Sequence, residues 1–117
     1  MAKFLAALCL AAAVAVSSAA CAALVNGNPA ALPHDKASLQ KLDTLQMGIL
    51  RAAVRYCNAF AGMRHEFNFC VTTNTDRDIR QSGNEALKAF HFGLPPMSRY
   101  DEGRSYVDIQ RVFHVKP

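Results

Sequence analysis

SLQKLDTLQMGILRAAVRYCNAFA, residues 38–61, is the stretch whose pattern decides the fold, and it predicts a long amphipathic helix. Apolar residues recur along it at three- and four-residue steps: Leu39, Leu42, Ile49, Ala53, Tyr56, Cys57 and Phe60. The opposite stripe is polar or small: Gln40, Thr44, Gly48, Arg51, Arg55 and Asn58. Two such stripes are typical of a helix with one face on a core and the other in solvent. Ser38 suits the N-cap and Gly62 the end of the helix.

Before this helix, residues 1–22 have the order of a secretory signal peptide. Lys3 precedes the apolar run FLAALCLAAAVAV over 4–16, and small residues follow it. We therefore expect an exported protein, secreted or periplasmic, with no membrane span after processing. Residues 23–37 are rich in turn-forming residues and predict a flexible spacer. The remaining residues, 38–117, are predicted to form one small domain.

The number of cysteines that remain after cleavage favours one processing site over its alternatives. Cleavage after Ala22 removes Cys9 and Cys21 together and leaves an even number of cysteines. Cleavage after Ala20 would leave Cys21 as an unpaired thiol in an oxidising compartment. Lipidation of Cys21 also leaves an even pair, but Ser18 stands where a bulky aliphatic residue is usual. An uncleaved anchor would need the weakly apolar residues up to Val25 to complete a span of about 20 residues.

Cys57 and Cys70 are the pair that remains, and we expect them to form a disulfide. The bond would close a loop of about 14 residues, which the chain-entropy model equates with about 3 kcal/mol. His65 lies between them, but the three residues lack the spacing with which zinc sites begin. No metal site and no cofactor is therefore predicted.

The segments after the first helix favour an α+β fold. Phe67, Phe69 and Val71 alternate with polar residues as in a strand over 67–72. A helix is predicted over 76–92, or starting afresh at 83, and it ends where Gly93 precedes two prolines.

Residues 105–115 fit either a strand or a helix opened by a capping box from Ser105 to Asp108. We favour the strand, because a lone strand at 67–72 needs a partner. The predicted fold is thus a long N-terminal helix packed on a small antiparallel sheet and braced by one disulfide. The alternative is an all-α fold of three helices.

The loop SRYDEGR, residues 98–104, is the strongest candidate for a binding surface. Arg99, Tyr100 and Arg104 are residue types that anchor protein interfaces, and they lie in a loop after a stiff proline pair. Catalytic candidates are weaker. His65 and Glu66 are neighbours that a strand would point to opposite faces, and His91 lies where a helix C-terminus favours the protonated ring.

These features predict a non-catalytic exported binding protein, such as an inhibitor, an immunity protein or an envelope factor, with a protein partner. The alternative is a small RNase-like hydrolase in which a histidine and a glutamate supply acid–base chemistry. That alternative requires His65, Glu66 or His91 to converge with the 98–104 loop. The basic residues are scattered through a chain of net charge +4, so no nucleic-acid partner is indicated.

Processing can be tested directly by intact-mass analysis of the exported protein. We expect a chain that begins at Ala23 and gains no alkyl group until it is reduced, because its two thiols are then joined. A mass that retains Cys21, a lipid adduct, or two thiols that alkylate without reduction would each contradict part of this prediction.

Overall fold

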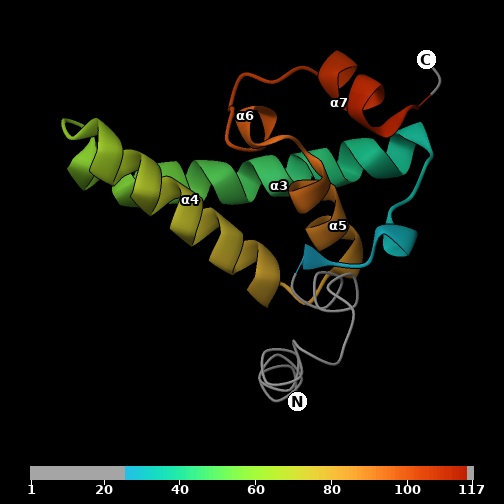
Figure 1. The fold of residues 1–117 in the computed structure, drawn as a ribbon, viewed down its shortest axis with the longest axis horizontal. Coiled ribbons are helices and arrows are strands. Elements are labelled where there is room, and N and C mark those ends of the chain that lie inside the picture. The colour runs from blue at the N-terminus through green and yellow to red at the C-terminus, as the bar shows by residue number, and fades with distance from the viewer. Residues whose placement is uncertain (1–25, 116–117) are drawn as a thin grey trace, which may run out of the picture.

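The computed structural model describes residues 26–115, and all regular structure in that range is helical (Figure 1). The α-helices are α3 (Lys36–Tyr56), α4 (Arg64–Gln81), α5 (Glu85–Gly93), α6 (Pro96–Arg99) and α7 (Tyr106–Phe113). Two short 3-10 helices accompany them, η1 (Pro29–Ala31) and η2 (Cys57–Phe60). The described residues form one small helical domain, and none of their helices is both long enough and apolar enough to cross a membrane.

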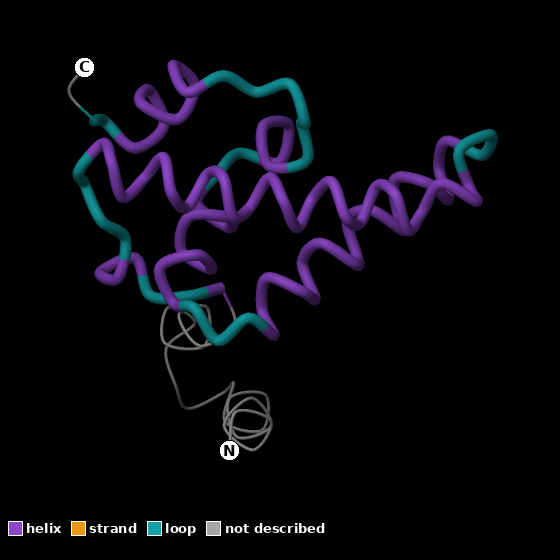
Figure 2. Tube along the Cα trace, turned by 180° about the vertical axis from the view of Figure 1, so that it is seen from behind, coloured by secondary structure: helices purple, strands orange, loops and turns teal. Residues whose placement is uncertain are grey.

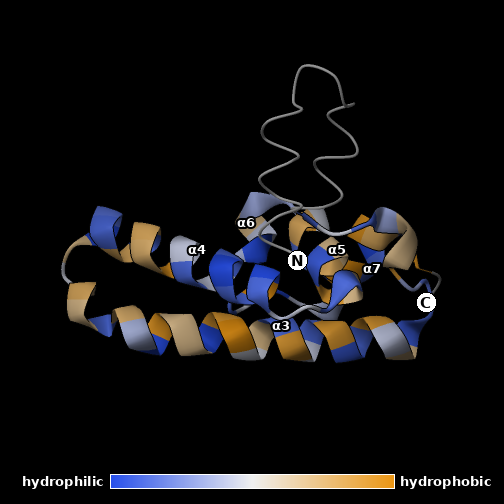
Figure 3. Ribbon diagram, turned by 90° about the horizontal axis from the view of Figure 1, so that it is seen from below, coloured by the Kyte–Doolittle hydropathy of each residue, from blue (hydrophilic) through white to orange (hydrophobic). Residues whose placement is uncertain are grey.

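The two longest helices, α3 and α4, form an antiparallel hairpin whose turn lies at one end of the molecule (Figures 1 and 2). They diverge as they leave the turn, and α5 packs between their far ends in contact with both. In the view of Figure 1, α6 and α7 lie above α3 and α4 lies below it, and Figure 3 shows α4, α5, α6 and α7 all on one face of α3. The turn of the hairpin therefore projects away from the rest of the fold.

Helix boundaries follow from side chains that cap them. Asp35 caps α3 by accepting a hydrogen bond from the backbone N–H of Ser38 at 2.9 Å. Asn84 caps α5 in the same way, through the N–H of Leu87 at 3.0 Å. Gly83 has a φ of +70°, which separates α4 from α5 in a conformation that other residues rarely adopt.

Buried apolar side chains form two clusters along α3. The larger lies among α3, α4, α5 and α7 and contains Leu39, Leu42, Ile79, Leu87, Phe90, Leu94 and Ile109. The smaller lies within the hairpin and contains Met47, Leu50, Cys57 and Val71. Figure 3 shows apolar and polar residues alternating in bands along α3, as a helix covered on one side requires.

The first predicted helix is confirmed, with two differences. It begins two residues earlier than Ser38, and after Tyr56 it tightens into η2 before the turn. The predicted polar stripe is exposed throughout. Of the predicted apolar stripe, however, Tyr56 and Phe60 are exposed, at 74% and 39%, although Cys57 between them is fully buried.

The predicted strand over 67–72 is wrong, since these residues lie inside α4. The same segment also begins a four-residue repeat of residues that are buried or half-buried on the side of α4 toward α3: Phe67, Val71, Thr75 and Ile79. Packing of that face outweighs the β-propensity of a short alternating run. Phe69, placed with Phe67 in the prediction, is instead 70% exposed.

The predicted strand over 105–115 is also wrong, and the helical alternative holds. Ser105 accepts from the backbone N–H of Asp108, and Asp108 accepts in return from the N–H of Ser105, so both members of the capping box are made. With no strand among the described residues, the α+β prediction is replaced by an all-α fold of five helices.

The structure contains the predicted Cys57–Cys70 disulfide, which joins η2 to the first half of α4 with 5.8 Å between the Cα atoms. It closes the loop that forms the turn of the hairpin. At the opposite end, residues of the predicted spacer pack on α5. Gly27 is buried there, and a Cβ atom at this position would lie 2.6 Å from the backbone nitrogen of Ala89.

We expect Leu50→Ala to lower the free energy of unfolding by about 2–5 kcal/mol, because Leu50 is fully buried between α3 and α4. Leu45→Ala is the matched control on the same helix, where the side chain is largely exposed, and should cost less than about 0.5 kcal/mol. Urea unfolding of the oxidised variants measures both. Equal losses would show that the packing face of α3 is wrongly assigned.

Candidate functional site

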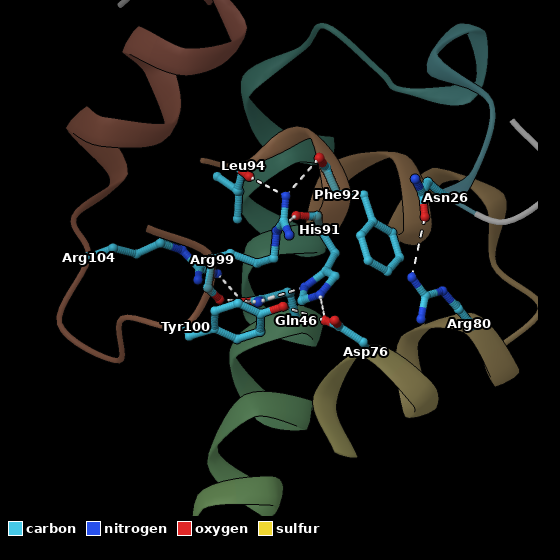
Figure 4. Close-up of polar contacts among 10 residues, drawn as sticks. All are labelled: Asn26, Gln46, Asp76, Arg80, His91, Phe92, Leu94, Arg99, Tyr100 and Arg104. Atoms are coloured by element: carbon cyan, nitrogen blue, oxygen red, sulfur yellow. Dashed lines mark hydrogen bonds and ion pairs between the residues drawn. The ribbon is translucent and has the colours of Figure 1, made fainter. Parts of the chain in front are cut away.

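A buried network of hydrogen bonds lies where α3, α4, α5 and residues 98–104 meet (Figure 4). The predicted loop over 98–104 is in part helical, because Ser98 and Arg99 lie in α6. Its centre is the imidazole of His91 on α5, which is fully buried. The ring nitrogen Nε2 lies 2.7 Å from Oδ1 of Asp76 on α4, and Nδ1 lies 3.0 Å from Nε2 of Gln46 on α3. His91 therefore links three helices through two opposite edges of one ring.

The partners of Gln46 determine which nitrogen of His91 carries the proton. Oε1 of Gln46 accepts from the guanidinium of Arg104, a group that can only donate. The amide NH2 must then face the carbonyl oxygen of Arg99, at 2.8 Å, and Nδ1 of His91. Nδ1 is thus an acceptor, and the neutral ring donates its Nε2–H to Asp76.

Arg104 closes the network on the α3 side. Its side chain is buried and donates from Nε and Nη2 to Oδ1 of Asp43, at 3.0 and 2.6 Å. A third nitrogen, Nη1, donates to the carbonyl oxygen of Ser98 at 3.3 Å. The ion pair, with the amide of Gln46 beside it, supplies the polar partners that a buried guanidinium requires.

Arg99 stabilises the C-terminus of α5. Its guanidinium donates to the carbonyl oxygens of His91, Phe92 and Leu94, at 3.0, 3.1 and 2.9 Å. The last carbonyls of a helix have no partner within it, and a cation also complements the negative end of the helix dipole. The guanidinium is therefore engaged by backbone within the fold.

Tyr100 joins the network from the loop. Its hydroxyl donates to Oδ1 of Asp76 at 2.7 Å, so one carboxylate oxygen accepts from both Tyr100 and His91. Burial and the neighbouring carboxylate raise the pKa of Tyr100. Burial alone would raise the pKa of Asp76, but the two hydrogen bonds outweigh it and hold that pKa below its ordinary value of 3.8.

His91 is held neutral by its surroundings. Burial lowers its pKa below the ordinary value of 6.5, and the hydrogen bond to Asp76 offsets this only in part. The cations of Arg99 and Arg104 lower the pKa further. Because both ring nitrogens are engaged and the ring is fully buried, this histidine holds helices together and meets no substrate in this conformation.

The structure thus brings the three predicted binding residues, Arg99, Tyr100 and Arg104, together around His91. It does not bring the other catalytic candidates there. His65 and Glu66 lie in the first turn of α4, at the turn of the hairpin, where both are exposed. Of the three catalytic candidates, His91 alone therefore converges with residues 98–104, as a fully buried ring, while Glu66 lies at the far end of α4.

His65 and Glu66 instead border an open groove of about 550 Å³ on the flank of the hairpin. Its apolar lining comes from the rings of Tyr56, Phe60 and Phe69. Thr73, Asn74 and Arg77 on α4 supply polar groups along the remaining length. Tyr56 and Phe69 are 74% and 70% exposed, the highest values among the large ring side chains of the described residues.

The disulfide lies beside this groove and fixes the backbone at its two most exposed aromatic residues. Tyr56 directly precedes Cys57, and Phe69 directly precedes Cys70. Cys57 is fully buried, whereas Cys70 reaches the groove wall. Nδ2 of Asn74 donates to the carbonyl oxygen of Cys70 at 2.8 Å and also approaches both sulfur atoms. The two ring-bearing residues are therefore attached to a cross-linked point of the backbone.

Sequence reasoning missed Gln46, Asp76 and Asp43, the acceptors and donors that organise the network. The available signal was Gln46. It lies four residues after Leu42 and four before Leu50, on the buried side of α3, so a polar residue occupies a core position. Such a residue needs partners inside the fold. Asp76 and Asp43 carry no comparable signal.

Comparison of the chain with protein-family models, with curated proteins and with solved structures finds no match in any of the three. Within residues 26–115, no three histidine, cysteine, aspartate or glutamate side chains gather closely enough to hold a metal ion.

The buried neutral His91 makes stability depend on pH. Its pKa is lower in the folded than in the unfolded protein, so the unfolded chain binds the proton more readily. The neutral His91 contributes fully to stability above the pKa that this histidine has in the unfolded chain, about 6.5. As the pH falls below that value, the free energy of unfolding decreases by at most about 1.4 kcal/mol per pH unit. We expect urea unfolding to show this decline between about pH 7 and 5.

His91→Gln should flatten the profile, because the amide does not titrate. His65→Gln is the matched control at an exposed histidine and should leave the slope unchanged. A His91→Gln profile parallel to that of the unmodified protein would contradict the neutral buried ring.

Proposed function

We propose that this protein is an exported, non-catalytic binding protein whose partner is another protein, and that the aromatic groove on the α3–α4 hairpin is its contact surface. The observation that carries the proposal is the pair of exposed rings, Tyr56 and Phe69, each next to a bridged cysteine. Exposed aromatic side chains on a rigid backbone lose little conformational freedom on binding and are favoured interface anchors.

The shape of the groove favours a peptide segment over a small molecule. Pockets for small ligands bury most of the ligand surface, whereas this groove is open to solvent. A segment of a partner protein can lie along such a surface and place apolar side chains against the three rings.

The polar end of the groove favours a carboxylate on that segment. Arg77 is exposed at the groove, where it donates to Oδ1 of Asn74 at 2.6 Å and pairs with Oδ1 of Asp78 at 3.4 Å. An exposed pair of this kind contributes little and can be exchanged for a carboxylate of a partner. Of the arginines, three (Arg51, Arg55 and Arg64) lie in the distal half of the hairpin, residues 51–70, whose one acidic residue is Glu66. We therefore propose an apolar, acidic segment as the occupant.

The groove is a better candidate than the 98–104 loop. The guanidinium of Arg99 is bound to backbone carbonyls, and that of Arg104 is buried against Asp43. Using either of them for a partner would first break bonds within the fold. Export to an oxidising compartment, secreted or periplasmic, is part of this proposal. The apolar leader pattern of residues 1–22 and the disulfide support it.

Selection from a random peptide display library against the oxidised protein tests the proposal. We expect the recovered peptides to be enriched in apolar and acidic residues. Tyr56→Ala and Phe69→Ala should each weaken their binding by about 2 kcal/mol or more, as measured by calorimetry. Val107→Ala is the matched control, because Val107 is an exposed apolar residue on α7.

Tyr100→Ala separates this proposal from binding through the loop. Binding that depends on Tyr100 and ignores Tyr56 and Phe69 would move the site to residues 98–104. Peptides without acidic enrichment would contradict the proposed occupant. A hydrolytic activity lost in His65→Ala would overturn the non-catalytic assignment.

A further inference from the structure

We infer that the turn of the α3–α4 hairpin inserts into the surface of an anionic lipid bilayer. The turn consists of AFAGM, residues 59–63, which we name the tip loop. It contains five consecutive residues without a polar side chain, and all five are exposed. This inference goes beyond the proposed function and does not depend on it.

The tip loop is exposed at one end of the molecule and does not pack into the core of the domain. It lies at the projecting end of the hairpin, away from α5, α6 and α7 (Figures 1 and 3). Phe60 and Met63 are its large side chains, and 39% and 48% of their surface is exposed. A convex apolar end of this kind can enter the boundary between lipid headgroups and acyl chains without any change of fold.

The backbone of the tip loop can enter that boundary at low cost. The N–H of Ala61 donates to the carbonyl oxygen of Asn58 at 3.0 Å, and the N–H of Met63 donates to that of Phe60 at 2.8 Å. Hydrogen-bonded turns carry fewer groups that must be stripped of water. The disulfide closes the same turn and keeps its ends together.

The positive charges near the tip loop favour an anionic bilayer over a neutral one. Arg64 follows the tip loop directly, and Arg55 and Arg51 precede it on α3. None of the three forms an ion pair with any residue between 26 and 115, and all are exposed. Long arginine side chains can reach headgroup phosphates while the apolar residues go deeper.

Vesicle binding of the oxidised protein tests this inference. We expect binding to vesicles of equimolar phosphatidylcholine and phosphatidylglycerol, little binding to phosphatidylcholine alone, and weaker binding as salt is raised. Met63→Asp should abolish binding, because it places a charge at the inserted end. Arg64→Gln should weaken it about fivefold, the effect of about 1 kcal/mol per basic residue near such a surface.

Matched controls lie on α7, far from the tip along the chain. Val107→Asp and Arg111→Gln make the same kinds of change at exposed positions. Each should change the affinity for anionic vesicles by no more than about twofold, which is the nonspecific effect of the altered net charge. Losses equal to those at Met63 and Arg64 would overturn the inference. So would equal binding to neutral vesicles, or no binding to either.

A second measurement locates the contact. The chain has no tryptophan, so Phe60→Trp gives a single reporter in the tip loop. We expect brominated lipids to quench its emission in anionic vesicles and not the emission of Val107→Trp. Quenching of Val107→Trp alone would place the bilayer at α7. If Met63→Asp prevents capture of the selected peptides and leaves vesicle binding intact, the tip belongs to the protein interface and the lipid proposal fails.

Discussion

The imidazole of His91 and its two hydrogen bonds are the constraint on which the arrangement of helices depends. One ring edge meets Asp76 on α4 and the other meets Gln46 on α3, while the residue itself belongs to α5. Gln46 can take only one amide orientation because Arg104 and the carbonyl of Arg99 fix its two ends. Each of these donors faces an acceptor, so protonating Nδ1 of His91 would place its N–H against the amide N–H of Gln46. The register of three helices is thereby tied to one tautomer.

The molecule divides its stabilising interactions between two ends. The polar network and the larger apolar cluster hold α5, α6 and α7 at one end of the hairpin. At the other end no third helix of the described residues covers the turn, and the disulfide adds a covalent brace to the smaller apolar cluster between α3 and α4. A covalent bond needs no apolar cover, so Tyr56, Phe60 and Phe69 can remain exposed there without loss of order. The exposure of the surface that we propose as the contact site is thus a consequence of how this end is stabilised.

Sequence patterns predicted the features that can be recognised within a single segment or from a count of one residue type. The amphipathic stripe of residues 38–61 predicted α3, and an even pair of cysteines predicted the disulfide. The segment 67–72 could not be assigned in this way, because Phe67 and Val71 satisfy a period of two and a period of four alike. Only the presence of α3 beside it decides between them. The network was beyond prediction for the same reason, since Gln46, Asp76 and His91 lie far apart in the sequence and meet only in the fold.

The polar residues of the 98–104 segment show that composition alone does not say whether a side chain already has partners within the fold. Arginine and tyrosine are favoured at interfaces because each joins apolar area to strong donors. The same two properties suit them to closing a small domain, where helix ends and buried carboxylates need donors with reach. In this protein Arg99 and Arg104 meet such needs inside the fold. The hairpin presents the reverse case, in which residues that pattern assigns to the core, Tyr56 and Phe60, lie on the surface. A residue's availability to a partner therefore depends on which of its groups already bind within the fold, and this is why we propose the hairpin as the contact surface.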